Sequence, residues 1–200
     1  MRLYKKGHRL KVIRLPKDDK QLIARAIEHD RAAQRELFER FAPKMLGVCR
    51  RYISDLHHAE DVMLTGFFRV FHHLEQFRGD GSFEGWIRRI MVRESISFLR
   101  KNKDRDSEYD EAALKNISGE NNAAVADLEA EHLQELIDGL PRGYRMVFVL
   151  SAIEGYTHPE IADLLQISEG TSKSQLYKAR KMLQDRLELQ RKRYYGTEEY

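Results

Sequence analysis

The sequence predicts an all-α protein in which a flexible acidic linker joins two small helical domains. Three observations lead to this prediction. Apolar residues recur at intervals of three and four through most of the 200 residues, which is the period of an amphipathic helix. Capping residues, glycines and prolines divide the pattern into helix-sized segments. Between residues 103 and 127 the pattern weakens and acids outnumber bases, so we expect the linker there, with room for one short helix around Leu114.

Composition narrows the class of protein. The hydrophobic fraction of 42% is enough for two modest cores, and the formal net charge of +3 hides a basic N-terminal arm over residues 1–20. Cys49 is the single cysteine, which excludes an intramolecular disulfide and a cysteine-based zinc site and fits a reducing compartment. The basic N-terminus has no apolar signal core, and no segment is apolar enough to span a bilayer. We therefore expect a soluble cytoplasmic protein without membrane insertion.

The first domain is expected over residues 21–102. A short helical pattern covers residues 21–28, and Asp30 is expected to cap a longer helix that reaches about Tyr52. Pro43 lies inside that pattern and predicts a kink or a break. A further helix is expected over residues 58–75. The apolar faces of the last two helices, which should form the core, are Leu37, Phe41, Met45, Val48 and Tyr52, and then Val62, Phe67, Val70, Phe71 and Leu74.

The helix over residues 58–75 has a second face that combines acids with apolar side chains. An apolar residue on a face already marked as polar suggests a protein partner, although single exposed hydrophobic residues are common. This face consists of Glu60, Asp61, Leu64, Thr65 and Phe68.

Residues 77–101 open as a glycine-bearing turn and continue as a helix. Gly79 and Gly81 flank Asp80 and allow turn conformations that other residues avoid. Ser82 is then expected to cap a helix that begins at Phe83.

Arginines and aromatic residues share the helix that follows this turn. Spacings of four and seven residues place its arginines in one stripe, and a neighbouring apolar face is expected to be core. This arrangement favours nucleic-acid binding, although basic stripes are often only solvated and tryptophan more often serves packing. The stripe is Arg89, Arg93 and Arg100 with Trp86 and Ser97 alongside, and the core face is Ile87, Ile90, Met91 and Phe98.

The second domain is expected over residues 128–189, followed by a tail over residues 190–200. A helix over residues 128–140 carries Leu133, Leu136, Ile137 and Leu140. Pro141 marks the start of another helix, which Gly155 ends. Its apolar residues are Tyr144, Val147, Phe148 and Leu150.

Two capped helices then follow in close succession. Thr157 and Glu160 match a capping box, with Pro159 in the first turn, and Ser168 is expected to cap a second helix after a turn at residues 166–167. This predicts a helix-turn-helix whose second helix fits a DNA major groove, although helical hairpins of similar spacing occur in other proteins. The inner face of that helix is Ser172, Leu176, Ala179 and Leu183, and the outer face is Thr171, Ser174, Tyr177, Lys178 and Lys181, with Lys173 at the edge.

Taken together, residues 22–187 resemble the bacterial sigma factors of the small, two-domain extracytoplasmic-function group. AEDVMLTGFFRVF, residues 59–71, is similar to the segment that docks on the polymerase clamp. Residues 77–101 are similar to the segment that melts and reads the minus-ten element, and residues 140–183 to the module that reads the minus-thirty-five element. The resemblance implies a promoter-specificity factor for core RNA polymerase that lacks catalytic activity and cofactors.

The resemblance also implies roles for individual residues. Core polymerase would be bound by Glu60, Asp61, Leu64, Thr65 and Phe68. Minus-ten DNA would be bound by Arg78, Gly79, Asp80, Ser82, Trp86, Arg89, Arg93 and Ser97. Minus-thirty-five DNA would be bound by Thr171, Lys173, Ser174, Tyr177 and Lys178. The chain departs from the family at Leu64 and Thr65, where a glutamine and an acid are usual, and at Arg93, where asparagine is common.

The partners that the resemblance implies are core RNA polymerase, promoter DNA and an anti-sigma factor that is often anchored in the membrane. Within the holoenzyme the chain would be a monomer.

Two other classes of protein compete with this interpretation. An ordinary helix-turn-helix regulator would explain the second domain equally well but not the arginine-rich turn and helix of the first. An enzyme would require a catalytic or metal-binding set. His57, His58, His72 and His73 lack a clear third metal ligand, and no phosphate loop, nucleophile elbow or paired carboxylates are visible, so no metal site is expected.

Overall fold

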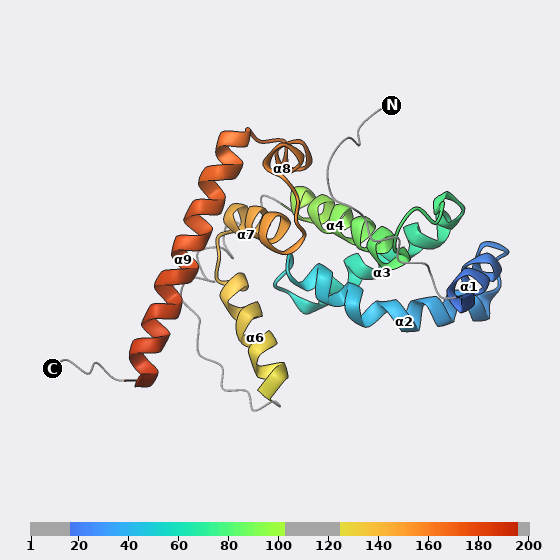
Figure 1. Ribbon diagram of the computed structural model, residues 1–200, viewed down its shortest axis with the longest axis horizontal. Helices are drawn as coiled ribbons and strands as arrows, with labels where there is room; N and C mark the ends of the chain where they lie inside the picture. Colours follow the sequence, from blue (N-terminus) through green and yellow to red (C-terminus); the bar gives the residue numbers. More distant parts are fainter. Residues whose placement is uncertain (1–16, 103–124, 196–200) are drawn as a thin grey trace. The chain divides into compact units, whose positions relative to one another are not determined.

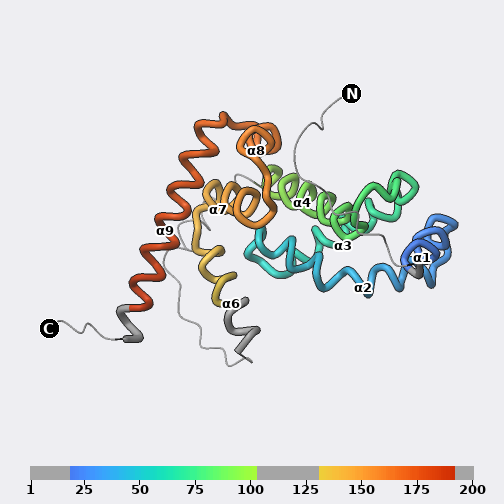
Figure 2. The backbone as a smooth tube through the Cα atoms, in the orientation of Figure 1, coloured from blue at the N-terminus to red at the C-terminus, as the bar shows by residue number. Residues whose placement is uncertain are grey.

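The computed structural model describes residues 17–102 and 125–195, and every regular element in these residues is a helix (Figures 1 and 2). Among them, residues 17–49 and 57–95 form one compact unit, and residues 50–56, 96–102 and 125–195 form the other. The predicted all-α class with two helical parts is confirmed. Most of the expected linker and the short helix considered around Leu114 lie outside the described residues, and so does most of the N-terminal arm.

The helices of the first part follow the predicted order, with shifted ends. They are α1 (Lys17–Ile27), α2 (Arg31–Arg50), α3 (Leu56–His72), the short 3-10 helix η1 (Leu74–Gln76) and α4 (Phe83–Lys101). The sequence pattern placed no helix before Gln21, whereas α1 begins four residues earlier. Asp19 explains the difference, because it lies in the first turn of α1, where acids are favourable, and pairs with Arg40 of α2.

Asp30 caps α2 as predicted. Its Oδ1 accepts hydrogen bonds from the backbone N–H groups of Ala32 (2.8 Å) and Ala33 (3.2 Å). Arg25 at the end of α1 pairs with the other carboxylate oxygen at 2.6 Å. This side-chain hydrogen bond, together with the backbone hydrogen bonds, lowers the pKa of Asp30 below its ordinary value. One aspartate therefore both starts α2 and fixes the turn from α1.

Pro43 does not break α2, which is helical from Arg31 to Arg50. A proline inside a helix removes one backbone hydrogen bond and costs about 3 kcal/mol. Its neighbours on either side, Phe41 and Met45, are both buried, as are Leu37 and Val48. Burial of this stripe offsets the cost. Of the predicted kink or break at Pro43, the break is therefore wrong, and the predicted helix is confirmed.

Side chains from α2, α3 and α4 form the core of the first unit. Phe38 and Phe67 meet edge to face with ring centroids 4.8 Å apart, and Phe41 meets Phe83 in the same way at 5.5 Å. Gly66 of α3 lets the thioether of Met91 approach, since an added Cβ would lie 2.3 Å from the Met91 sulfur. The close packing of α3 on α4 thus depends on the smallest side chain at this point.

The buried face of α4 differs in part from the predicted one. Ile87 and Met91 are fully buried as expected, whereas Ile90 and Phe98 are only half-buried. The sequence pattern missed Val92, Ile96 and Leu99, which are buried. The buried face of α4 is therefore wider than the single stripe that the sequence predicts.

The second part contains α6 (Val125–Asp138), α7 (Arg142–Phe148), the short π-helix η2 (Val149–Ile153), α8 (His158–Leu165) and α9 (Glu169–Tyr195). Helix α9 packs on α6, α7 and α8. Gly155 ends the α7–η2 segment with a φ of 77°. Leu136, Ile137 and Leu140 are buried as predicted, but Leu133 is 51% exposed and does not belong to the core.

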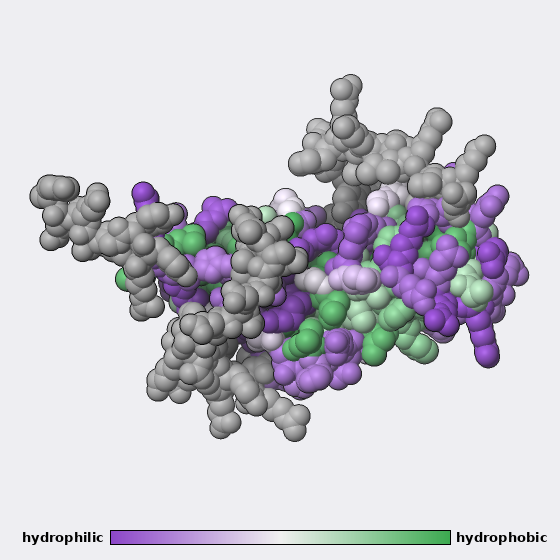
Figure 3. All heavy atoms as spheres, turned by 90° about the horizontal axis from the view of Figure 1, so that it is seen from below, coloured by the Kyte–Doolittle hydropathy of each residue, from purple (hydrophilic) through white to green (hydrophobic). Residues whose placement is uncertain are grey.

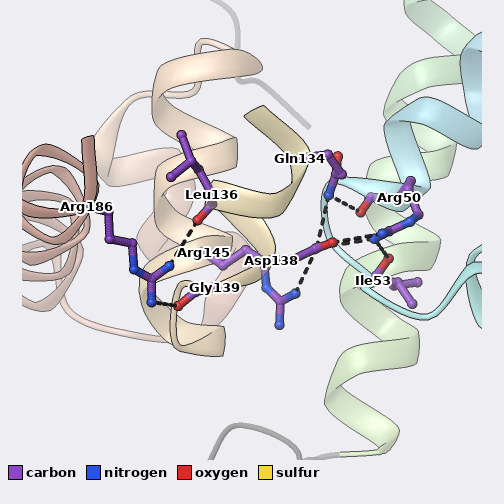
Figure 4. Close-up of polar contacts among 8 residues, drawn as sticks. All are labelled: Arg50, Ile53, Gln134, Leu136, Asp138, Gly139, Arg145 and Arg186. Atoms are coloured by element: carbon purple, nitrogen blue, oxygen red, sulfur yellow. Dashed lines mark hydrogen bonds and ion pairs between the residues drawn. The ribbon is translucent and has the colours of Figure 1, made fainter. Parts of the chain in front are cut away.

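Helix α9 continues to Tyr195, past the residue at which the tail was expected to begin. Arg186, which precedes this extension on α9, contacts the end of α6 (Figure 4). Its Nη2 donates to the carbonyl oxygen of Gly139 at 2.5 Å, and its Nη1 donates to that of Leu136 at 3.4 Å. These carbonyls lie at the end of α6, where helical partners are missing, so Arg186 caps the helix from a distance.

Candidate nucleic-acid and partner interfaces

The second face of α3 is exposed as predicted. Leu64 and Phe68 are 52% and 72% exposed, and Asp61 and Thr65 are exposed beside them. Figure 3 shows how hydrophobic side chains reach the surface among hydrophilic ones on one face of the molecule. Two large apolar side chains on one exposed helix face match the pattern of a protein-binding surface.

Local contacts fix part of this α3 face. The Thr65 hydroxyl donates to the carbonyl oxygen of Asp61 at 2.9 Å, so it serves the helix backbone. The Phe68 ring lies parallel to the ring of His72, with centroids 6.3 Å apart. The half-buried Glu60 lies 3.7 Å from His57. The carboxylate of Asp61 and the apolar surfaces of Leu64 and Phe68 are therefore the groups best placed to meet a partner.

The turn before α4 has the predicted glycine geometry. Gly79 and Gly81 have φ values of 76° and 114°, a region that favours glycine, and the N–H of Gly81 donates to the Gly79 carbonyl at 3.0 Å. Ser82 starts α4, since its Oγ accepts from the backbone N–H of Gly85 at 3.3 Å. Arg78 and Asp80 are exposed on the turn, and Ser82 is half-buried.

A cluster of aromatic rings lies directly beneath this turn. Trp86 and Phe83 stack with an interplanar angle of 16° and centroids 5.9 Å apart, and Phe77 meets Phe83 at 5.0 Å and Trp86 at 5.7 Å. The cluster joins the residue before the turn to the first two turns of α4. Trp86 thus packs against its neighbours while remaining half-exposed, and Phe77 is a member that the sequence pattern did not identify.

The arginines of the predicted stripe on α4 are exposed to solvent. Arg89, Arg93 and Arg100 are all exposed, and Ser97 is half-buried beside them. Two glutamates of this helix form ion pairs with other helices. Glu94 pairs with Arg69 of α3 at 2.8 Å, and Glu84 pairs with Lys44 of α2 at 2.9 Å. The exposed face of α4 therefore presents positive charge that suits a phosphate backbone.

The helix-turn-helix is formed by α8 and α9. The backbone N–H and the hydroxyl of Thr157 both donate to Glu160, at 2.8 and 2.7 Å, which lowers the pKa of this carboxyl. Gln166 ends α8 in the left-handed conformation, with φ 57° and ψ 48°. Ser168 then caps α9 by accepting from the N–H of Thr171 at 3.0 Å.

A polar contact joins the two helices of this motif. Ser172 is fully buried, and its Oγ lies 2.9 Å from Nδ1 of His158 in the first turn of α8. Leu176 and Ala179 are buried on the same side of α9, as predicted. Nothing in the sequence pattern pointed to His158, because the contact spans the turn between the helices.

The predicted minus-thirty-five residues lie on the outer face of α9 and differ in their exposure to solvent. Tyr177 is 70% exposed, and Lys173, Ser174 and Lys178 are exposed as well, whereas Thr171 is half-buried. The Thr171 hydroxyl lies 2.8 Å from that of Ser168, and Ser174 donates to the Thr171 carbonyl at 3.0 Å. Both hydroxyls are thus engaged within the helix.

Tyr144 of α7 supports one of the lysines on this face. The ammonium group of Lys178 lies 5.9 Å from the centroid of the Tyr144 ring, a cation–π distance. The sequence placed Tyr144 in the core stripe of its helix and gave no sign of this contact.

The described residues contain neither a metal-binding cluster nor a reactive thiol. They hold no cluster of three histidine, cysteine or acidic residues that would suit a metal ion. Cys49 is buried, and burial raises the pKa of its thiol to about 11, so it is not a ready nucleophile. No helix in residues 17–102 and 125–195 is both long and apolar enough to cross a membrane.

Comparison with known families agrees with this geometry. Residues 37–105 match the family described as Sigma-70 region 2, and residues 130–183 match Sigma-70, region 4. The first match contains the α3 face, the turn and the arginine stripe, and the second contains the helix-turn-helix.

Curated relatives align over nearly their whole length. The RNA polymerase sigma-H factor of Pseudomonas aeruginosa is 29% identical over 181 residues, which cover 85% of this chain and 94% of the relative. The ECF RNA polymerase sigma-E factor of Escherichia coli K12 is 27% identical over the same shares of both chains. Among solved structures, the sigma factor RpoE from Bartonella quintana, in complex with the anti-sigma factor NepR, matches with a TM-score of 0.51 and 20% identity, covering 86% of this chain and 98% of that one. With both sigma-70 regions present in order, the chain belongs to the extracytoplasmic-function group of the sigma-70 family and is a sigma factor of RNA polymerase.

Proposed function

We propose that three separate surfaces of this sigma factor divide the work of transcription initiation. The α3 face binds core RNA polymerase, the turn and arginine stripe around α4 capture the minus-ten element, and the outer face of α9 reads the minus-thirty-five element. The chain itself catalyses no reaction, since the polymerase supplies the chemistry. Such a protein acts in the bacterial cytoplasm, where polymerase and DNA are found.

The core-binding residues in this proposal are Asp61, Leu64 and Phe68, with Glu60 and Thr65 at the margin. Exposed apolar side chains next to a carboxylate can bury area against a partner while the charge fixes the register. Leu64 stands where the family usually has a polar residue, so the apolar part of this contact is larger here.

The minus-ten residues act on single-stranded DNA. A base released from the duplex would be held near the half-exposed Trp86, at the turn formed by Arg78, Gly79, Asp80 and Ser82. Arg89, Arg93 and Ser97 would contact the neighbouring bases and phosphates. Because Arg93 carries charge where an amide is common, it contributes donors to DNA without the acceptor that an amide would add.

The minus-thirty-five residues act on duplex DNA. Lys173, Tyr177 and Lys178 extend from α9 toward the major groove, while Thr171 and Ser174 shape the start of the helix. The Tyr144 ring lies within cation–π distance of the Lys178 ammonium group.

The observation that carries the proposal is the exposure of Leu64 and Phe68 on α3, because two large apolar side chains on one exposed helix face suit burial against a protein partner such as core polymerase. An anti-sigma factor is the expected inhibitor, and it would compete for the same surfaces. Affinity purification of the full chain from its native cells tests both partners together. Recovery of the core polymerase subunits supports the proposal, whereas recovery of promoter DNA without polymerase would favour the regulator.

A further inference from the structure

Asp138, the last residue of α6, contacts two arginines within the second compact unit (Figure 4). Its two carboxylate oxygens accept hydrogen bonds from Nη2 and Nη1 of Arg50, at 2.8 and 3.2 Å. Nη1 of Arg145 on α7 lies 3.5 Å from Oδ1 of the same carboxylate. Gln134 donates from its Nε2 to the carbonyl oxygen of Arg50 at 2.9 Å and to Asp138 at 3.0 Å. A two-point charge pair and a backbone contact thus hold Arg50, the last residue of α2, on α6.

The end of α4 is held in the same unit by another arginine. Arg100 donates from its Nη2 to the carbonyl oxygen of Leu164 in the last turn of α8, at 2.8 Å. The last carbonyls of a helix lack helical partners and attract cations. Arg51, next to Arg50, adds a longer ion pair of 3.8 Å with Glu154. We call the Arg50–Asp138 and Arg100–Leu164 contacts together the arginine latch.

Water can reach the groups that form the arginine latch. The side chains of Arg50 and Asp138 are 27% and 21% exposed, and Arg100 is exposed as well. Because solvent competes for such contacts, each stabilises the latch only modestly. Asp138 also keeps Arg145 and Gln134 as partners when Arg50 leaves. The Arg50 contact can therefore open without leaving this carboxylate unpaired.

The two promoter elements set the distance that the chain must span. As their names state, the minus-ten and minus-thirty-five elements lie about 25 base pairs apart, or about 85 Å along duplex DNA. Helix α4 has 19 residues and is about 28 Å long. The path from the turn at Gly81 along α4, across the Arg100–Leu164 contact and on to Tyr177 of α9 measures at most about 70 Å even when drawn straight. While this contact holds, the two DNA-reading surfaces cannot reach both elements together.

We propose that the arginine latch is closed in the free chain and that its opening is a required step of promoter recognition. In the latched unit, a carbonyl oxygen of α8 holds the guanidinium of Arg100. Once the latch opens, Arg100 joins Arg89 and Arg93 on the exposed stripe of α4 and contacts DNA phosphates. DNA and the Leu164 carbonyl thus compete for one arginine, which couples opening to DNA binding. The inference rests on the proposed function, because it requires that α4 and α9 read different elements.

A reversible cross-link tests whether the latch must open. Arg50→Cys and Asp138→Cys in one full-length chain are joined by a short bis-methanethiosulfonate reagent, which a reductant later cleaves. The native Cys49 is buried and its thiol pKa is raised to about 11, so it does not compete for the reagent. With core polymerase, the linked chain should give at least about 10-fold less promoter-specific transcript than before linking and should recover after reduction. The same double variant treated with a one-ended methanethiosulfonate reagent controls for the added bulk and should remain active.

Arg50→Gln tests the latch in the opposite direction. It removes the charge pair and should raise the open fraction by about 2- to 10-fold, and the affinity of the holoenzyme for a promoter with both elements should rise by the same factor. The open fraction is measured as the distance between spin labels at Lys101→Cys and Gln184→Cys, which replace exposed residues of α4 and α9 in the same unit. Arg31→Gln removes an exposed arginine from the other end of α2 as the matched control and should change neither quantity.

The outcomes separate the latch from the proposed function. A linked chain that transcribes as well as the chain with the one-ended reagent would overturn the inference and leave the proposed function intact. An unchanged label distance or an unchanged promoter affinity in Arg50→Gln would do the same. A wild-type chain that yields no promoter-specific transcript would instead contradict the proposed function.

Discussion

Nδ1 of His158 lies 2.9 Å from Oγ of the fully buried Ser172, so a single hydrogen bond joins the first turn of α8 to the start of α9. The two helices of the DNA-reading motif are therefore held by a polar contact as well as by apolar packing. The tautomer decides which atom donates, but the bond forms in either case.

The two ends of this bond should differ in their effect on stability. His158→Ala leaves a buried hydroxyl without its partner and should lower the free energy of unfolding by about 1–3 kcal/mol. Ser172→Ala should cost less, because the half-buried imidazole can turn to water. Urea unfolding followed by far-UV circular dichroism measures both changes. Fluorescence of Trp86, the single tryptophan, reports on the other unit and should not change. The double variant completes the comparison. If it loses as much stability as the two single variants added together, the two side chains are not coupled and the contact is contradicted.

Adjacent phenylalanines of α3 should separate partner binding from folding. Phe68 is 72% exposed, so Phe68→Ala should leave stability within about 0.5 kcal/mol. If Phe68 anchors the contact with core polymerase, its removal should weaken that affinity by about 2 kcal/mol, or roughly 30-fold. Phe67 is 2% exposed, and Phe67→Ala should instead destabilise the unit by about 3–5 kcal/mol. Binding of labelled core polymerase, measured by fluorescence anisotropy, provides the comparison. Leu189→Ala, which removes an exposed apolar side chain from α9, serves as the control, and an equal loss of core affinity there would argue against the α3 face.

Arg93→Ala should affect promoter melting more than polymerase binding. The side chain is exposed, so its loss removes a DNA contact worth roughly 1–3 kcal/mol without disturbing the core. Permanganate reactivity of unpaired thymines measures the open complex, and anisotropy measures core affinity. Arg31→Ala removes an exposed arginine from the same unit as a control. If both measurements fall together for Arg93→Ala, the residue does not act on DNA.

A fall in pH should weaken the N-terminal caps of two helices, α2 and α8. The side-chain hydrogen bond from Arg25 lowers the pKa of Asp30, and the backbone hydrogen bond from Thr157 lowers the pKa of Glu160. The stabilisation from each carboxylate is complete above its ordinary pKa of 3.8 or 4.5 and is lost as the pH falls through the lowered value. Asp30→Asn should therefore flatten the decline of the urea midpoint, followed by Trp86 fluorescence, between about pH 5 and 2. Glu160→Gln should do the same for hydrogen exchange at the start of α8. An unchanged pH dependence in either variant would show that the helix cap does not depend on the charge.

Features set by a few neighbouring residues were predictable from the sequence. The caps at Asp30, Ser82 and Ser168 and the positive φ of Gly79 and Gly81 all follow from local chemistry, and the structure has them where the sequence placed them.

Features set by packing between distant residues were not predictable. Helix α2 runs through Pro43 because its buried residues on both sides outweigh the lost hydrogen bond. The Tyr144 ring of α7 lies within cation–π distance of Lys178 on α9, and Arg186 of α9 donates to the carbonyl of Gly139 after α6. Each of these features depends on the position of a second helix in the fold, and the hydrophobic period of one helix does not specify that position.

The most direct test of the central claim is a reconstituted run-off transcription assay on genomic templates with purified core polymerase. Addition of the full chain should produce discrete transcripts from specific promoters, and Phe68→Ala and Arg93→Ala should each reduce them. Transcripts that remain at the background of core polymerase alone on every template would contradict the claim that this chain directs promoter-specific initiation.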